Sequence, residues 1–205
     1  MKEFNWKDKN VLITGIYGFV GSNLTKYLIK KKANVYGVYK KNSTISLLNI
    51  EKIKNFNSVQ LTNNVNENTT ILSDLIFDKH IDICFHLAAQ VEVLKALKEP
   101  YDTFNNNINL SLSLFESVKK TKLVKTIIHC STDKVYGNID KKKLPYKEYY
   151  NPNPIYPYDV SKYVCELIGQ SYYDNYKIPI ITTRTSNLYG PGQLNFSALI
   201  PYTIK

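Results

Sequence analysis

The sequence predicts an α/β protein with a doubly wound, mainly parallel sheet. Two observations indicate this class. Apolar, strand-like runs alternate with segments of helical periodicity along the chain, and a glycine-rich turn follows the first of these runs, residues 11–13. Strands that alternate with helices pair in parallel, because each helix returns the chain to the same end of the sheet. Ligands then bind beyond the carboxyl ends of the strands, as in the Rossmann-type arrangement.

The glycine turn has the spacing Gly15-x-x-Gly18-x-x-Gly21. We expect a helix over 22–32 after it and a second strand over 34–38, which together complete a βαβ unit. Without side chains in the turn, a diphosphate can approach the backbone N–H groups at the helix N-terminus. An isolated match of this kind is often only a turn, but its place between a strand and a helix favours dinucleotide binding.

The remaining elements continue the alternation, apart from a polar, asparagine-rich stretch over 55–70 for which the pattern is weak. The expected elements are a short helix over 70–79, a strand over 81–87, a long helix over 101–120, a strand over 126–130, a loop over 137–157, a helix over 157–176, a strand over 178–184 and a turn over 187–192.

Composition limits the other possibilities. With 205 residues, one domain is the default, and the formal net charge of +10 comes from dispersed lysines without a nucleic-acid motif, so we expect no nucleic-acid partner. No apolar run reaches the length of a membrane span, and no signal peptide opens the chain, which predicts a cytoplasmic protein. The cysteines, Cys84, Cys130 and Cys165, lack metal-ligand spacing, so we expect reduced thiols and no metal site.

A catalytic constellation follows the predicted strand 126–130. Thr132 lies directly beyond it, and Tyr158 and Lys162, four residues apart, share one face of the next helix. An ammonium about 4 Å away can lower the pKa of a phenol by about 3 units. Tyr158 is therefore a candidate general base for a sugar or alcohol hydroxyl, with Thr132 holding the reacting oxygen.

The same Tyr-x-x-x-Lys spacing occurs three more times, beginning at Tyr27, Tyr36 and Tyr173. Spacing alone therefore identifies no site. Only Tyr158 opens the helix that follows a strand and a Ser-Thr-Asp-Lys turn, and this position singles it out.

Six segments together resemble the extended short-chain dehydrogenases/reductases of the NAD-dependent epimerase/dehydratase type. They follow the family order from residue 11 to the end of the chain: Thr14-Gly15-Ile16-Tyr17-Gly18-Phe19-Val20-Gly21, His86-Leu87-Ala88-Ala89-Gln90, Thr103-Phe104-x-x-Asn107, Ser131-Thr132-Asp133-Lys134-Val135-Tyr136-Gly137, Pro157-Tyr158-Asp159-Val160-Ser161-Lys162 and Arg184-Thr185-Ser186-Asn187-Leu188-Tyr189-Gly190.

The resemblance implies that Thr132, Tyr158 and Lys162 form a catalytic triad and that Asn187 contacts a nucleotide-sugar substrate. It implies NAD as the cofactor and a homodimer formed through the long helices. The cofactor-binding residues that it implies are Gly15, Tyr17, Gly18, Phe19, Val20, Gly21, Lys40, Lys41, Leu87, Ala88, Ala89, Gln90 and Asn107.

Asp133 and Lys134 further resemble the pattern of nucleotide-sugar 4,6-dehydratases, in particular the CDP-glucose version, as do Gln90 and residues 193–201. In that chemistry, hydride leaves C4, Lys134 removes the C5 proton, Asp133 helps to expel the 6-hydroxyl as water, and hydride returns to C6. A 4-epimerase needs no such pair and remains an alternative. A non-catalytic dinucleotide-binding protein is the other alternative, and a turn cap would account for the pair in that case.

Two departures from the family pattern affect these expectations. No carboxylate follows the strand 34–38, and Lys40 and Lys41 stand there instead, so NADP is an alternative to NAD. The chain also stops at Lys205. We therefore expect residues 190–205 to be the start of a substrate lobe that is largely missing, and we expect the short chain to be impaired or inactive.

Overall fold

One parallel sheet organises the chain, in a computed structural model that describes residues 4–40, 46–140, 142, 144–196 and 198–204. The sheet has six strands in the order β3-β2-β1-β4-β5-β6, and all neighbouring strands are parallel. This order is that of the doubly wound Rossmann-type sheet, so the predicted fold class is confirmed. The strands are β1 (Asn10–Thr14), β2 (Asn34–Lys40), β3 (Phe56–Leu61), β4 (Ile83–His86), β5 (Thr126–Thr132) and β6 (Ile180–Thr185).

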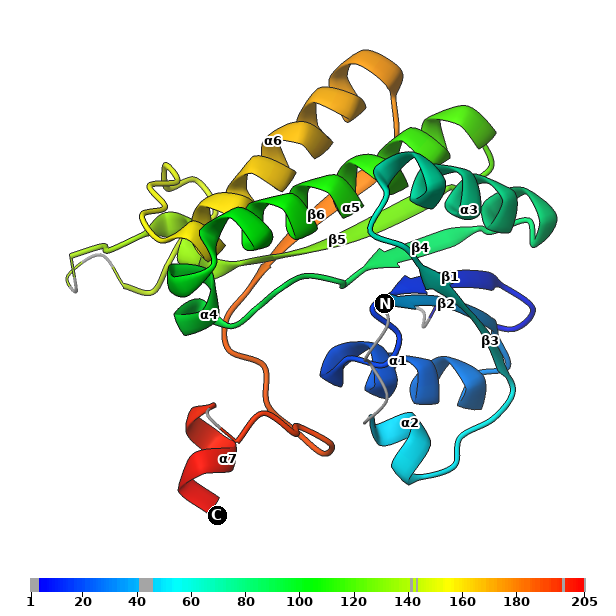
Figure 1. Cartoon of the computed structure of the whole chain (residues 1–205), viewed down its shortest axis with the longest axis horizontal. Coiled ribbons are helices and arrows are strands. Elements are labelled where there is room, and N and C mark those ends of the chain that lie inside the picture. The colour runs from blue at the N-terminus through cyan, green and yellow to red at the C-terminus, as the bar shows by residue number, and fades with distance from the viewer. Residues whose placement is uncertain (1–3, 41–45, 141, 143, 197, 205) are drawn as a thin grey trace.

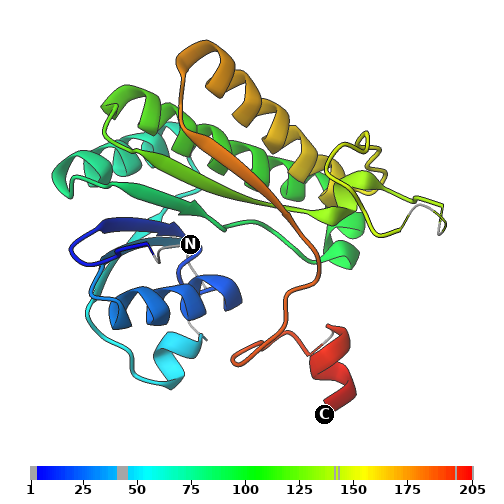
Figure 2. The same ribbon diagram turned by 180° about the vertical axis from the view of Figure 1, so that it is seen from behind.

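Helices cover both faces of the sheet (Figure 1). The face with three long helices carries α3 (Val65–Asp78), α5 (Pro100–Thr121) and α6 (Pro157–Tyr176), and the other carries α1 (Phe19–Lys30) and α2 (Leu47–Ile50). The view from behind shows the same two layers (Figure 2). Three short helices remain: α4 (Val93–Lys98) after β4, the 3-10 helix η1 (Asp133–Tyr136) after β5, and α7 (Leu199–Ile204).

The two longest helices lie close to their predicted bounds, since both start and stop signals are local. A proline occupies the first turn of each, where its missing N–H costs no hydrogen bond. Each ends at a lysine in the left-handed conformation, Lys122 with φ 56° and Lys177 with φ 56°. The amphipathic pattern between these signals then gives α5 and α6 their length.

The polar stretch 55–70 is where the structure adds most to the sequence-based expectation. It contains β3 and the first turns of α3, which begins earlier than predicted. β3 alternates exposed and buried positions weakly, and its pairing with β2, Val38 opposite Val59, places it at the edge of the sheet. Asn64 caps α3 by accepting hydrogen bonds from the backbone of Asn66 and Glu67.

The larger core lies between the sheet and the layer of α3, α5 and α6. It includes Leu72, Ile76, Leu114 and Ile127, each fully buried. Phe115 is also fully buried here, so this residue belongs to the core and not to a dimer seam. At about 25 cal/mol per Å² of apolar area, burial of such side chains is the main stabilising contribution of the layer.

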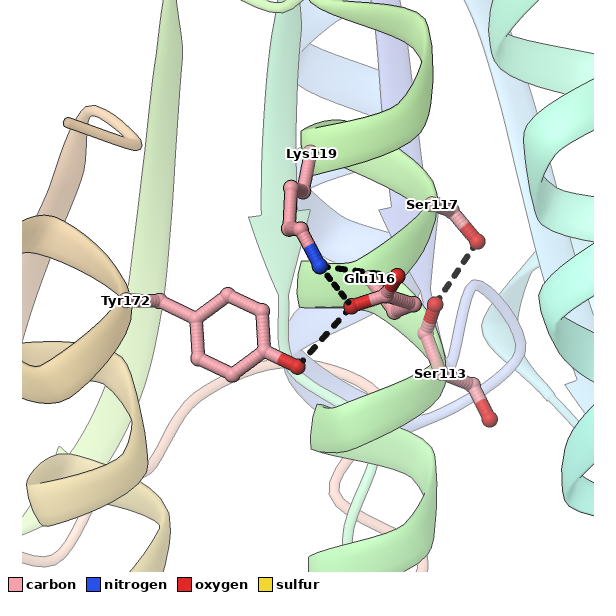
Figure 3. Close-up of polar contacts among 5 residues, drawn as sticks. All are labelled: Ser113, Glu116, Ser117, Lys119 and Tyr172. Carbon is pink, nitrogen blue, oxygen red and sulfur yellow. Dashed lines mark hydrogen bonds and ion pairs between the residues drawn. The ribbon is translucent and has the colours of Figure 1, made fainter. Parts of the chain in front are cut away.

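Polar contacts join α5 and α6 at the surface of this layer. Figure 3 shows Glu116 of α5 accepting hydrogen bonds from Lys119 (3.1 Å) and from the phenol of Tyr172 on α6 (3.1 Å). The same view shows Ser117, whose hydroxyl donates to the carbonyl of Ser113 at 2.7 Å. The two helices are therefore fixed against each other by polar contacts as well as by packing.

The segment after β6 leaves the sheet and turns back toward α1, and α7 lies apart from the sheet layers (Figures 1 and 2). Asn23 of α1 donates to the carbonyl of Pro191 at 3.0 Å, which fixes this segment near the glycine turn. Among the helices that the structure describes, none combines the length and apolarity needed to cross a bilayer.

Replacing Gly37 of β2 by alanine is expected to destabilise the fold. A Cβ there would lie 2.3 Å from Cδ1 and 2.6 Å from Cβ of Ile16, which is itself fully buried. The overpacking should lower the free energy of unfolding by about 1–3 kcal/mol, measured by urea denaturation. In the control Gly169→Ala, the new Cβ would meet neighbours only at 3.6–3.7 Å. That helical change should leave stability equal or raise it, and equal losses in both variants would contradict the argument.

Candidate active site

The glycine turn at the end of β1 requires glycine at positions 15 and 21. Gly15 has φ +73°, and a Cβ on it would lie 3.0 Å from the Cα of Ala88. A Cβ on Gly21 would lie 2.2 Å from the carbonyl oxygen of Gly15. The N–H of Gly18 donates to the same oxygen at 2.9 Å, which closes the turn. These contacts keep the N-terminus of α1 open to an anionic ligand.

A cleft of about 780 Å³ lies over this turn, at the carboxyl ends of the strands. It brings together most of the cofactor-binding residues that the family resemblance implies. Those in the lining are Gly15, Gly18, Phe19, Val20, Gly21, Lys40, Leu87, Ala88, Ala89 and Gln90. A long cleft at this edge of the sheet fits a dinucleotide lying across β1 and β4.

Two of the expected cofactor residues, Tyr17 and Asn107, lie outside the lining of the cleft. The side chain of Tyr17 packs edge-on against Tyr39 and donates to or accepts from the hydroxyl of Ser58, instead of lining the cleft. Asn107 is buried behind the wall of the cleft, which it supports. Lys41 lies outside the described residues.

Lys40 occupies the place where a carboxylate would bind the adenosine ribose. Its ammonium donates to the side-chain oxygen of Asn106 on α5, across the cleft. Burial lowers the pKa of this lysine. The cation is therefore tied to α5, and the cleft contains an ammonium in place of an acceptor for the ribose hydroxyls.

The segment after β6 contributes cleft residues that the sequence did not single out for the cofactor. Gln193 and Asn195 belong to the lining, although the resemblance assigned this stretch to the substrate lobe. Gly192 approaches Leu47 of α2 so closely that a Cβ there would lie 3.0 Å from the leucine Cβ. Only this long-range packing could have revealed that 190–195 closes the cleft.

The predicted catalytic residues meet at the start of α6. Thr132, at the end of β5, lies beside Tyr158, where its hydroxyl favours the phenolate, and both residues are buried. The ammonium of Lys134 lies 5.9 Å from the centre of the Tyr158 ring. The Thr132 hydroxyl also lies 3.4 Å from Oδ1 of Asp133. The structure thus brings threonine, tyrosine, lysine and aspartate together, as the motif order implies.

The protein groups alone do not acidify Tyr158 as the Tyr-Lys spacing predicts. Its pKa is raised to about 12, mainly because burial disfavours the phenolate, and the hydroxyl of Thr132 offsets this only in part. Lys162 is 4% exposed, and burial lowers the pKa of its ammonium as well. The expectation of an acidified phenol is therefore wrong for the protein groups by themselves, because the cost of burial exceeds their attraction.

Substrate-side residues border a second, broad groove of about 1510 Å³ between α6, β6 and the loop over 144–152. Asp133 and Ser186 are among its lining residues. Asn187, the predicted substrate contact, follows Ser186 and is exposed. Asp133 therefore borders this open groove.

A buried ion pair that the sequence analysis did not assign lies behind the catalytic turn. Glu166 of α6, 8% exposed, accepts from Arg184 of β6 at 2.7, 3.1 and 3.2 Å. The hydroxyl of Ser131 also donates to Glu166. The guanidinium of Arg184 lies 4.8 Å above the ring of Tyr136, which follows Asp133 and Lys134 in η1. This cluster fixes β5, β6 and η1 to the catalytic helix.

Replacing Glu166 by glutamine should destabilise the protein markedly. The change leaves the guanidinium of Arg184 buried without a countercharge, and breaking a fully buried pair in this way costs about 3–5 kcal/mol. Because the Arg184 side chain is 24% exposed, we expect a loss nearer the low end, measured by urea denaturation. In the control Glu116→Gln, the lost partner is Lys119, whose side chain is 36% exposed, and the change should cost less than about 1 kcal/mol. Equal effects would refute the assignment.

Tyr158 should make the stability of the protein pH-dependent at alkaline pH. Its native pKa of about 12 exceeds the value of about 10 for an exposed phenol, so the folded chain holds this proton more tightly. The contribution is complete below about pH 10 and is lost as the pH rises toward about 12. Tyr158→Phe should flatten the decline of unfolding free energy in this range, whereas the exposed-site control Tyr156→Phe should follow the wild type. Parallel profiles for all three proteins would contradict the raised pKa.

Comparison with known proteins places the chain in a family. The family model described as GDP-mannose 4,6 dehydratase matches residues 12–204. A protein of Dictyostelium discoideum named dTDP-D-glucose 4,6-dehydratase is 36% identical over 203 residues, covering 90% of this chain and 45% of that protein. The human protein of the same name is 31% identical over 188 residues, with 90% and 53% covered. The chain therefore spans about half the length of these curated relatives.

Solved structures agree with this placement. The dTDP-glucose 4,6-dehydratase of Bacillus anthracis, in complex with NAD, has a TM-score of 0.81 at 28% identity, covering 96% of this chain and 60% of that chain. The UDP-glucose 4-epimerase of Thermotoga maritima, with UDP-glucose, has a TM-score of 0.79 at 30% identity, covering 90% and 57%. The match of the family model over residues 12–204 shows that the chain belongs to the GDP-mannose 4,6 dehydratase family of NAD-dependent epimerases and dehydratases.

Proposed function

We propose that this chain carries the cofactor-binding and catalytic half of an NAD-dependent nucleotide-sugar 4,6-dehydratase. The observation that carries the proposal is the placement of Lys134, with its ammonium 5.9 Å from the ring centre of Tyr158. Oxidation at C4 needs only Tyr158 and its neighbours. A second base beside the same tyrosine is useful only if a proton must also leave C5, which distinguishes dehydration from epimerisation.

The cleft supports a dinucleotide as cofactor. The glycine turn accepts a diphosphate because backbone N–H groups and the N-terminus of α1 point to it without intervening side chains. Ala88 and Ala89 leave room beside the turn for the nicotinamide half. NAD is the proposed cofactor, and the solved dTDP-glucose 4,6-dehydratase of Bacillus anthracis is an NAD complex. NADP is the competitor, because Lys40 brings an ammonium to the adenosine end of the cleft.

Tyr158 is the proposed base for the 4-hydroxyl of the sugar. The proton moves from that hydroxyl to the phenolate oxygen, while Thr132, beside the phenol, holds the reacting oxygen. When bound, NAD supplies a hydride acceptor and a positive charge in the cleft. That charge opposes the burial that raises the pKa of Tyr158.

Lys134 and Asp133 are the proposed pair for the elimination of water. The 4-ketone makes the C5 proton acidic, so Lys134 in its neutral form can accept it, while the carboxyl of Asp133 donates a proton to the departing 6-hydroxyl. One water leaves for each sugar, the hydride taken from C4 returns to C6, and Lys134 returns the proton to C5. Because Asp133 lines the open groove and Lys134 lies over Tyr158, the two groups face the sugar from adjacent positions.

The substrate is proposed to be a nucleoside diphosphate hexose. The Asp133-Lys134 pattern favours CDP-glucose, whereas the named relatives are dTDP- and UDP-glucose dehydratases. The experiment below therefore compares sugars that carry different nucleotides. Asn187 is the proposed substrate contact, and residues 190–205 are the proposed start of the substrate lobe.

We also propose that the protein is cytoplasmic and forms a homodimer. The homodimer is supported by exposed apolar side chains on α5 and α6, including Tyr101 at 77% and Leu167 at 51%.

Incubation of the chain with CDP-glucose, GDP-mannose, UDP-glucose or dTDP-glucose, each with NAD or NADP, should give a 4-keto-6-deoxy sugar with one of them. The reaction should be slow, because the chain spans only about half the length of its curated relatives and lacks their remaining substrate contacts. Tyr158→Phe should lower the rate about 10²–10⁴-fold, since it removes the general base. Lys134→Met should still allow C4 oxidation, so reduced cofactor should accumulate while 6-deoxy product is lost. Cofactor absorbance and mass spectrometry of the sugar measure the two steps separately.

The matched control is Lys147→Met, in the loop before α6, which should leave both steps unchanged. A C4 epimer as the sole product would establish the epimerase alternative. Cofactor binding without turnover on any of these sugars would support the non-catalytic alternative and overturn the dehydratase proposal for this chain.

A further inference from the structure

A continuous chain of buried hydrogen bonds runs beneath the cleft, from the glycine turn to the catalytic helix. It begins at Thr14, the last residue of β1, whose partner across the sheet is His86 at the end of β4. The Thr14 hydroxyl lies 2.9 Å from Nδ1 of His86, and Nε2 of the same ring lies 2.9 Å from the hydroxyl of Ser111 on α5. All three side chains are at most 1% exposed.

The direction of these bonds follows from counting protons at Thr14. Its hydroxyl oxygen accepts from the backbone N–H groups of Leu87 and Ala88, both at 3.1 Å, which occupies both lone pairs. The hydroxyl proton is then free to be donated only to Nδ1 of His86. Nδ1 is therefore the unprotonated ring nitrogen.

The other half of the chain fits the same assignment. A neutral ring with a bare Nδ1 carries its proton on Nε2, which donates to the oxygen of Ser111. Ser111 in turn donates its own proton to the backbone carbonyl of Asn107 at 3.0 Å. Every donor in the series has one acceptor, and the opposite tautomer would leave the Thr14 proton without one.

Asn107 connects this series to the catalytic helix. Its side-chain amide donates to the hydroxyl of Ser161 at 2.9 Å, and Ser161 donates to the carbonyl of Tyr158 at 2.7 Å. The amide oxygen accepts from the N–H of Gln90 at 2.7 Å, which holds the wall of the cleft. The series thus links β1, β4, α5 and α6 at the end of the sheet where the cleft lies.

The surroundings keep the ring of His86 neutral. It stacks on His129 with the ring centres 5.4 Å apart and meets Phe115 edge-on at 6.0 Å. Burial, and then the charge of Lys162, lower the pKa of His86 to about 3. A charged ring would also need an acceptor at Nδ1, and Thr14 has no lone pair left for it.

We propose that His86 is a positioning residue, which as the neutral Nε2-protonated tautomer fixes the glycine turn through Thr14 and the helix of Tyr158 through Ser111 and Asn107. A single series of hydrogen bonds then holds the glycine turn and Tyr158, the proposed general base, at a fixed distance from each other. This inference rests on the proposed function in one respect, namely that the cofactor binds at the glycine turn.

The test compares Ser111→Ala with Ser117→Ala. Both serines are buried in α5, and each donates to the carbonyl four residues earlier, at 3.0 and 2.7 Å. Only Ser111 accepts from His86, whereas Ser117 lies closer to the C-terminal end of α5. We expect similar losses of stability in urea, but about ten-fold weaker NAD binding by calorimetry only for Ser111→Ala, because a buried donor of His86 loses its acceptor.

A second measurement needs no variant. Long-range proton–nitrogen correlation in the ¹⁵N-labelled wild-type chain, which has three histidines, reports which ring nitrogen carries the proton. It should show one ring with a protonated Nε2 and a bare Nδ1. This state should persist from about pH 6 to about pH 8, the range in which an exposed imidazole titrates. A proton on Nδ1 of His86, or equal NAD affinity of the two serine variants, overturns the inference. Absence of NAD binding by the wild type overturns the proposed function, and the spectrum then still decides the order of the hydrogen bonds.

Discussion

The structure depends on one close approach, that of the backbone of the glycine turn to the end of β4. A Cβ on Gly15 would lie 3.0 Å from the Cα of Ala88, and the carbonyl of Gly15 lies where a Cβ of Gly21 would be. This contact brings the N-terminus of α1, the wall of the cleft and the polar groups beneath it to the same end of the sheet. The site exists because two backbones touch there.

Polar groups buried around this contact must be satisfied within the protein, and the way they are satisfied orders the site. Glu166 and Arg184 connect the catalytic helix to β6 and to η1, and Asn107 connects it to the cleft wall. Lys162 is buried and charged beside two neutral histidines. Burial of these polar groups is unfavourable, but their hydrogen bonds hold them in defined positions. A loosely held catalytic group contributes little to the rate.

The balance between burial and nearby charge also sets the pKa of Tyr158 in the absence of a cofactor. Burial raises the pKa of Tyr158 to about 12, and the neighbouring protein groups do not reverse this. A tyrosine that remains protonated at neutral pH is poorly reactive as a base. Under the proposed function, a cofactor cation bound in the cleft would supply the missing electrostatic contribution, so the reaction would depend on a bound cofactor.

The sequence by itself determined the elements whose signals are local. The glycine spacing, the prolines that open α5 and α6, and the strand-turn order that singles out Tyr158 among equally spaced tyrosines all depend on neighbours a few residues away. Their positions in the structure agree with the pattern, and so do the fold class and the grouping of Thr132, Asp133, Lys134 and Tyr158.

Only the tertiary structure decided the contacts between distant segments. The weak pattern of 55–70 becomes β3 because β2 offers an edge, and 190–195 joins the cleft because it packs on α1 and α2. The pair of Glu166 and Arg184, the role of His86 and the raised pKa of Tyr158 likewise depend on burial. Burial is set by the whole fold, and no local window of sequence contains it.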